Sequence, residues 1–428
     1  MGTLAQTVLP FKVEVTEELL TANAGLALFG EFTQGLGLHR WLSQEMPKPG
    51  SGRGYEAVFY VSPLVLMLTG GGRSLEDLRT LKNDQALAEL LKQITLPSTD
   101  AVGDWLRRTG AGAGMTGLDR IKQRSVTTRL RQGSITRHTL DCDASQIIAE
   151  KEAAEITYKG EQGYMPMIGH LAEAGVVIHD DFREGNIAPA TQNLEFIKAC
   201  EARMPKGHTI AHVRLDSAGY QSGLFNYLEE TGKTFAIGGR LDKPTQQVIA
   251  EIPESAWKQY PDCALAETLH SMNETKKAFR LIVIRYKHQA DLFDDSPKYH
   301  VIASNRVEST EATLVWYRQR GEVSENGIKE LKIGFGMERM PCGQFAANAA
   351  FFRIGVIAHN LFVLFKHSAL GEDWQRQKVA TVRWRLFHLP GKVVRHAGAW
   401  VLKIASTAIE LFRSIREKSF ELAVANAP

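Results

Sequence analysis

The sequence predicts an α/β protein whose core is a mixed β-sheet flanked by helices, with a β-rich insertion and helical N- and C-terminal regions. Three observations predict this fold class. Apolar residues follow a helical period up to about residue 135 and then change to short β-prone runs that alternate with helical segments. Residues 240–310 contain stretches that alternate like antiparallel strands, and helical spacing returns near residue 310.

Residues 1–135 are expected to form a helical region. The segments 16–46 and 55–69 have helical apolar spacing. Ser74 is suited to cap the helix that follows it, and either Ser98 or Thr99 is suited to cap the next one. Several short helices joined by tight turns, ending in a basic stretch, resemble a helix-turn-helix-like region that binds DNA or serves in dimerisation. The alternative is a plain helical cap on the next domain.

The core begins at residue 136. We expect strands at 136–142, 163–170 and 175–179, then a helix, then a strand that ends at Asp216. Such a core would comprise residues 136–239 and 311–368, with the insertion at 240–310 and a helical, basic C-terminal region at 369–428.

The charges are unevenly distributed, although the net charge of the whole chain is only +3. Residues 101–137 contain eight Lys and Arg against two acids, and residues 374–428 contain ten against three. Basic segments on both sides of a near-neutral middle suit a protein that binds a phosphate backbone around its reaction centre. The alternative is that these segments are solvated helix faces.

Several protein classes are disfavoured. The four cysteines lie far apart without a CxxC pair or clustered histidines, which argues against a zinc site and a disulfide scaffold and favours a reducing compartment. The N-terminus lacks the pattern of a signal peptide. The most apolar run, 345–365, is interrupted by polar residues, so we expect a buried helix, no membrane span, and a cytoplasmic protein.

Acidic residues follow two of the expected strands. Asp143 follows the expected strand in the segment TLDCDAS (139–145), and Asp216 ends the strand in VRLDSAGY. Asp141 and Asp143 alternate with Cys142, so both carboxylates point to one face of the strand, and Asp141 is a second candidate. A simple strand-ending or capping Asp is the alternative for either segment.

A third carboxylate lies in the segment YRQRGEVSENGIKELK (317–332). Glu325, Lys329 and Lys332 stand at i, i+4 and i+7 and would share one face of a helix that Ile328 and Leu331 anchor. Carboxylates without His or Cys suit two Mg²⁺ ions about 4 Å apart, which catalyse phosphoryl transfer on DNA. A surface Glu–Lys pair is the alternative.

Together these segments resemble the DDE transposases of bacterial insertion sequences, specifically the insertion sequence 1380 group within the insertion sequence 4-like branch. That branch carries Tyr, two residues, Arg, three residues, Glu, six residues and Lys around its glutamate. Tyr317, Arg320, Glu325 and Lys332 match in type and order. Four residues separate Arg320 from Glu325 here, and this departure is tolerable if Gly321 breaks the helix.

The resemblance implies a ribonuclease-H-like catalytic domain in which Asp143, Asp216 and Glu325 bind two Mg²⁺ ions, with Mn²⁺ able to substitute. It also implies a homodimer that acts on double-stranded DNA at terminal inverted repeats. Water would free a 3′-hydroxyl, which then attacks target DNA. Tyr317, Arg320 and Lys332 would contact the DNA, as would Lys329 on the helical face derived above. The expected place of action is the bacterial cytoplasm, at the nucleoid.

Three alternatives share part of this evidence. A ribonuclease-H-like nuclease or resolvase would use the same acids without strand transfer. A DNA-binding regulator or a catalytically decayed transposase would bind DNA without cutting it. An unrelated metal-dependent phosphohydrolase is disfavoured because His-rich ligand motifs are missing from the sequence.

Overall fold

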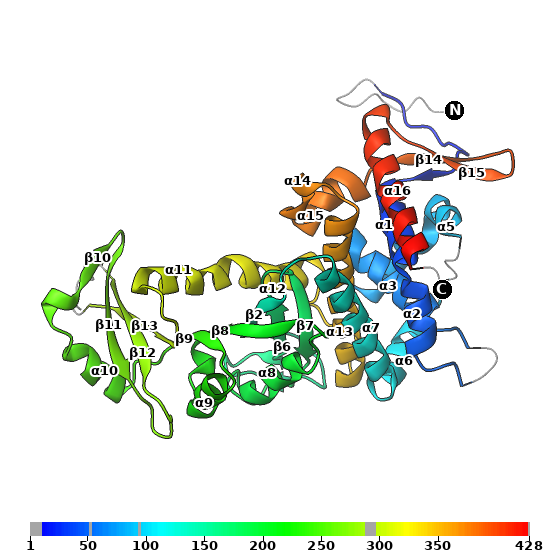
Figure 1. The fold of residues 1–428 in the computed structure, drawn as a ribbon. Coiled ribbons are helices and arrows are strands. Elements are labelled where there is room, and N and C mark those ends of the chain that lie inside the picture. Colours follow the sequence, from blue (N-terminus) through cyan, green and yellow to red (C-terminus); the bar gives the residue numbers. More distant parts are fainter. Residues whose placement is uncertain (1–10, 51–53, 93–95, 287–296, 427–428) are drawn as a thin grey trace.

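The computed structural model describes residues 11–50, 54–92, 96–286 and 297–426. Its central feature is a nine-stranded mixed sheet with the order β10-β11-β12-β13-β9-β8-β2-β6-β7. In Figure 1 the sheet lies to the left of the helical region formed by the two terminal parts of the chain. A large mixed sheet flanked by helices confirms the predicted α/β architecture.

Five strands form the core of the sheet. The central strand β2 (Arg137–Ala144) pairs antiparallel with β6 (Met167–Leu171) and parallel with β8 (Thr209–Leu215). Outside them, β7 (Val176–Asp181) pairs antiparallel with β6, and β9 (Thr234–Gly238) pairs parallel with β8. Three antiparallel strands followed by two parallel ones are consistent with a ribonuclease-H-like core. Because β2 and β8 are parallel neighbours, their C-terminal ends meet at one edge.

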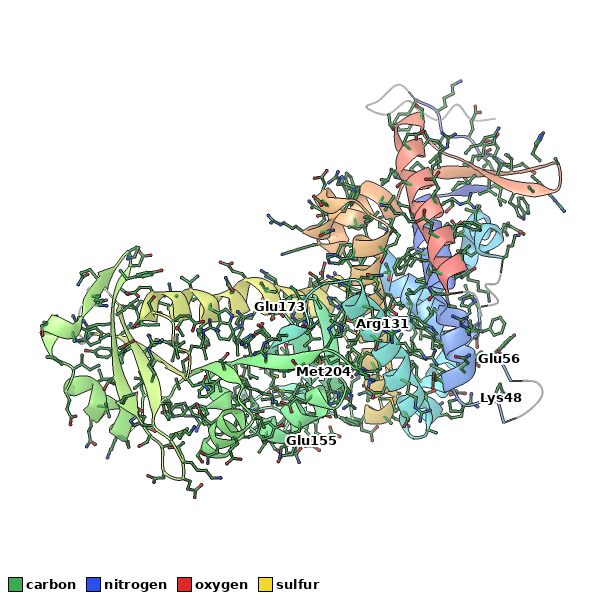
Figure 2. The ribbon with its side chains drawn as sticks, in the orientation of Figure 1. Lys48, Glu56, Arg131, Glu155, Glu173 and Met204 are labelled. Carbon is green, nitrogen blue, oxygen red and sulfur yellow. The ribbon has the colours of Figure 1, made fainter. Side chains whose placement is uncertain are left out.

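Further elements surround this core. After β2 comes a small three-stranded sheet, and the two helices α8 and α9 precede and follow β8. Glu173, labelled in Figure 2, lies in the turn between β6 and β7. Its carboxylate accepts a hydrogen bond from the N–H of Thr139 (2.9 Å), which lies toward the end of β2 opposite Asp143. The bounds are β3 (Ile147–Ile148), β4 (Glu155–Ile156), β5 (Gln162–Tyr164), α8 (Asn193–Glu201) and α9 (Ser222–Glu230).

The β-rich insertion extends the core sheet by four antiparallel strands. The strand β13 pairs with β9, and β12, β11 and β10 follow outward. Their apolar side chains form a cluster with Leu314 of α11 (Thr310–Arg320), so this helix rests on the sheet. The bounds are α10 (Lys243–Ala250), β10 (Lys258–Tyr260), β11 (Cys263–His270), β12 (Phe279–Tyr286) and β13 (Tyr299–Ser304).

The helical region packs around α13 (Phe345–Ser368), which contacts α3, α6 and α7. By length and hydropathy α13 resembles a membrane span, but 94% of its most apolar window is buried inside the protein, as expected of a core helix. Ser98 caps α6 by accepting a hydrogen bond from Ala101, and Ser74 forms a capping box, as predicted. The bounds are α1 (Ala24–Leu36), α2 (Leu38–Glu45), α3 (Val58–Gly70), α4 (Leu78–Asn83), α5 (Gln85–Leu91), α6 (Thr99–Gly110) and α7 (Gly114–Arg131).

The C-terminal region contains a β-hairpin in addition to the expected helices. The amphipathic spacing of 397–423 predicts a last helix that begins near Ala397, but the helix begins at Ile409. Ala397 and Gly398 instead have positive φ angles and close the hairpin turn. The first hairpin strand also pairs with β1 near the N-terminus. The bounds are β1 (Leu20–Thr21), α14 (Glu372–Gln375), α15 (Val379–Val382), β14 (Gly391–His396), β15 (Ala399–Lys403) and α16 (Ile409–Ala425).

A buried ionic cluster joins the helical region to the sheet. The ammonium of Lys122 on α7 lies 2.5 Å from Asp180 on β7 and 2.9 Å from Asp119. The guanidinium of Arg353 on α13 lies 3.0 Å from the other oxygen of Asp180. Burial alone would raise the pKa of Asp180, but Arg353 and Lys122 lower it well below its usual range.

We predict that Asp180→Asn lowers the free energy of unfolding by about 3–5 kcal/mol at pH 7, because Arg353 loses its partner carboxylate and the buried Lys122 keeps only Asp119. The depressed pKa means that the carboxylate stabilises the fold above about pH 4 and that this contribution is lost as the pH falls further. Urea denaturation between pH 3 and pH 7 measures the difference. Asp262→Asn, at an exposed turn, is the control and should change stability by less than about 0.5 kcal/mol.

Candidate active site

Two aspartates meet at the edge of the sheet where β2 and β8 end. Asp143 is the second-last residue of β2, and Asp216 follows β8 directly. The carboxylate of Asp216 accepts a hydrogen bond from the N–H of Ala218 (3.0 Å) and so caps the short turn 217–219. The negative charge of Asp216 contributes to the raised pKa of Asp143, so the two carboxylates are electrostatic neighbours.

The third carboxylate comes from the long helix that lies along the sheet. After α11 this helix continues through a π-helical turn (Gly321–Glu325), then α12 (Asn326–Lys329), then a second π-helical turn (Glu330–Gly334). Ile328 and Leu331 are buried, as predicted, and fix the helix to the core. Glu325 ends the first π turn with about half of its side chain exposed, on the side of Asp143.

Arg320 connects two of the three acids. Its Nη2 donates to Asp143 Oδ1 (2.7 Å) and its Nη1 donates to Glu325 Oε1 (2.6 Å). The residue is 7% exposed, and its Nε lies buried without a partner in the described structure. Burial opposes the charge of Arg320, yet Asp143 and the nearby Tyr317, Asp216 and Glu325 raise its pKa above the usual value. The guanidinium is therefore the central cation of the site.

The first π turn explains why the spacing between Arg320 and Glu325 is tolerated. The expectation was that Gly321 would break the helix, but Gly321 has helical angles and the helix continues. A π turn closes i to i+5 hydrogen bonds and so accommodates one residue more than an α-helical turn. Arg320 and Glu325, five positions apart, therefore stay on one side of the helix.

The π turns also change the face predicted for Glu325, Lys329 and Lys332. Lys332 reaches the site, and its ammonium donates to the carbonyl of Gln146 (2.7 Å). Burial lowers the pKa of Lys332, and the charges of Glu338 and Asp143 offset part of this shift. Lys329 is exposed, and the described structure shows no contact between it and the acids. An ideal helical period does not hold across two π turns, so the three side chains do not form one continuous face.

Tyr317 stands on the other side of Arg320. Its hydroxyl lies against Gly238 at the end of β9, where a Cβ would come within 3.0 Å of the Tyr317 oxygen and 2.9 Å of the Ser217 nitrogen. Burial, together with Asp216 and Glu325, raises the pKa of Tyr317. Gly238 therefore makes room for the tyrosine and for the turn that carries Asp216, a role that sequence patterns did not reveal.

Asp141 has a different environment from Asp143. It is 1% exposed, and both of its oxygens accept hydrogen bonds from Arg214 of β8, at 2.7 Å each. It also accepts a hydrogen bond from Ser324, the residue before Glu325, while Ser324 contacts the imidazole of His170 (2.9 Å). Arg214 in turn donates to the carbonyl of Trp316 on α11 (2.6 Å). Asp141 thus fastens the helix to the sheet and has no free oxygen for a ligand.

The candidate site combines three carboxylates with one central cation, Arg320. Burial and the negative charges of Asp216 and Glu325 together raise the pKa of Asp143 to about 6, although Arg320 acts in the opposite direction. Within the described ranges, no three His, Cys, Asp or Glu side chains are close enough to bind one metal ion together, and Arg320 stands between Asp143 and Glu325. Three all-oxygen donors still match the preference of hard cations.

Comparison with known proteins identifies a family. A family model described as "Transposase DDE domain group 1" matches residues 8–418. A solved structure of the piggyBac transposase, a synaptic complex with hairpin DNA, is similar with a TM-score of 0.46 and 13% identity, over 96% of this chain and 85% of that chain. No curated protein sequence matches the chain.

We predict that substitution of Asp141 destabilises the protein and that substitution of Asp143 does not. Asp141→Asn should lower the free energy of unfolding by about 3–5 kcal/mol, because Arg214 is buried and would lose its partner. Asp143→Asn should not lower it at pH 7, because the raised pKa shows that the fold disfavours the charged form. Urea denaturation of both variants checks this, and equal losses would contradict the division of roles.

Proposed function

Because the chain belongs to the family of DDE transposases, we propose that it binds the terminal inverted repeats of a bacterial insertion sequence, cleaves the element ends, and joins the 3′-hydroxyl ends to target DNA. The main support is the meeting of Asp143, Asp216 and Glu325 around Arg320 at one edge of the sheet. We further propose that the protein acts as a homodimer at the bacterial nucleoid, in the insertion sequence 1380 group.

In this proposal Asp143, Asp216 and Glu325 hold two Mg²⁺ ions, or Mn²⁺ in their place. Bound divalent metal would activate the attacking oxygen and stabilise the leaving oxygen of the phosphodiester. The remaining side chains position the reactants. Lys332 lies close enough to Asp143 for the two charges to interact, and its ammonium can donate a hydrogen bond to a DNA phosphate.

Arg320 has two tasks in this proposal. Its guanidinium keeps Asp143 and Glu325 at a fixed separation, and its charge offsets their repulsion. When these carboxylates engage a cation, the same guanidinium becomes available to a phosphate, together with the hydroxyl of Tyr317. Lys329, exposed on the same helix, is placed to contact the DNA backbone farther from the cleaved bond.

The first test replaces each acid with its isosteric amide. Asp143→Asn, Asp216→Asn and Glu325→Gln should each reduce divalent-metal-dependent cleavage of an inverted-repeat duplex by about a hundredfold or more, because metal positioning and charge stabilisation are lost. Binding of the same duplex in EDTA should remain. The measurement is a gel assay of strand cleavage and joining with end-labelled DNA.

Glu322→Gln is the matched control, since Glu322 lies on the same π turn but lines a cavity on the other side of the helix, with His170 and His359. It should cleave like the wild type. Cleavage by the Asp216 or Glu325 variant at the wild-type rate would refute the site. Wild-type cleavage without joining would instead identify a nuclease or resolvase.

The second test uses Gly238. In Gly238→Ala the new methyl group meets the Ser217 nitrogen at 2.9 Å and the Tyr317 hydroxyl at 3.0 Å, so the loop carrying Asp216 must shift. We expect about a tenfold to hundredfold loss of cleavage, since small displacements of positioning groups have effects of this size. Gly223→Ala, where a Cβ has open space, should behave like the wild type.

A further inference from the structure

The two basic parts of the chain are used differently in the folded structure. In the stretch 101–137, five of the eight cations contact an acid or a histidine within the protein, namely Arg107, Arg120, Lys122, Arg124 and Arg129. Apart from Arg107, whose partner Asp104 lies on the same helix, these cations join α7 to α2, β7 or α13. The basic part near the C-terminus forms fewer ion pairs with acids of the described structure.

The segment 374–409 contains seven Lys and Arg and no Asp or Glu. Within the described structure, two of the seven have strong internal partners: Lys392 pairs with Glu18, and Arg383 donates to backbone carbonyls of Leu68, Thr69 and Gly334. The other five are exposed and form no ion pair with a described carboxylate, and they are Arg376, Lys378, Arg385, Arg395 and Lys403. Such uncompensated charge favours a polyanionic partner.

Part of this charge lies on the β14–β15 hairpin, which Figure 1 shows extending away from the helical region. Lys392 and Lys403 are directly opposite each other in the ladder and therefore lie on one face of the hairpin. Repulsion between two like charges in this position destabilises the strand pair. Val393, on the other face, is buried against the core. Ala397 and Gly398 close the tip with φ angles of 48° and 81°, as in a tight hairpin turn that follows the strand twist.

The hairpin has the dimensions of a DNA-reading element. Strands of five and six residues span about 17–20 Å, and a two-stranded antiparallel ribbon fits the major groove of B-DNA. Arg395 and His396 lie near the tip and are exposed. Opposite Arg395 stands Trp400, with the guanidinium 5.8 Å from the ring centre.

The remaining charge of the segment lies beside the helix that carries Glu325. The N–H of Val379 donates to the carboxylate of Glu330 (2.6 Å), and Arg383 donates to the carbonyl of Gly334 (2.7 Å). The next residue, Trp384, is 83% exposed, and Arg385 follows it. Arg376 and Lys378 line the same cavity as Glu322 and Glu330, so the surface of segment 374–409 begins beside this helix, on the side away from Asp143, and continues to the hairpin.

We propose that segment 374–409 is a binding surface for double-stranded DNA, with the β14–β15 hairpin as an arm in the major groove. Arg376, Lys378 and Arg385 contact phosphates beside the helix that carries Glu325, and Arg395 and Lys403 contact the duplex farther out. This inference rests on the proposed function and deepens it, because it assigns the part of the chain that holds the DNA flanking the reacting phosphodiester.

The test is the salt dependence of duplex binding by the full-length double variant R395Q/K403Q, followed by fluorescence anisotropy in EDTA so that cleavage plays no part. Each lost phosphate contact lowers the slope of log affinity against log salt by about 0.9, so we expect a slope smaller by about 2. At 0.1 M salt the affinity should fall roughly tenfold to a hundredfold. R376Q/K378Q, on a different element, should lower the slope by a similar amount.

The matched control is K206Q/K243Q, which removes two exposed lysines from the catalytic domain and the insertion and should leave the slope unchanged. Slopes equal to the wild type for both C-terminal variants would overturn the inference while leaving the proposed function intact. A wild-type protein that binds no duplex would refute the proposed function itself. If R395Q/K403Q instead alters the mass of the DNA-free protein in light scattering, the hairpin is an interface between two copies, which also overturns the inference.

Discussion

The buried pair of Asp141 and Arg214 determines the geometry of the candidate active site. Both charges are almost completely removed from water, so they need partners for every polar atom, and the partners come from three elements. Asp141 accepts from Ser324, Arg214 donates to the carbonyl of Trp316, and these contacts hold the long helix at two points against strands β2 and β8. Glu325 follows Ser324 directly, so its position is set by this buried network and not by its own contacts alone.

The same helix deviates from ideal geometry where the chemistry is expected. Glu325 is the last residue of its first π turn and Lys332 lies in the second, and π turns are frequent at functional sites. The first of them brings Arg320 between Asp143 and Glu325. A rigid guanidinium fork suits this task better than a lysine would, because its two nitrogens reach both carboxylates in fixed directions.

The insertion and the two basic segments show how the rest of the chain supports this edge of the sheet. The insertion adds its strands to the core sheet, and the enlarged sheet provides the apolar surface beneath α11. The basic stretch before β2 contributes Lys122 to the buried cluster with Asp180 and Arg353, which joins α7, β7 and α13. The basic segment 374–409 near the C-terminus instead leaves most of its Lys and Arg side chains exposed. It contains no Asp or Glu of its own that could pair with them.

Local patterns in the sequence determined much of this protein. Strand-ending acids, helix caps, the buried core helix α13 and the anchors Ile328 and Leu331 all follow from periodicity and from residue types within a few positions.

Tertiary structure decided the rest. Asp141 and Asp143 look alike in the sequence, and only the pairing of β2 with β8, which places Arg214 next to Asp141, separates a buried ion pair from an available carboxylate. Arg320 reaches Asp143 across 177 positions of sequence, and the hairpin at 391–403 depends on a turn and on pairing with β1. Contacts between residues so distant along the chain depend on strand register and burial, which no local period encodes.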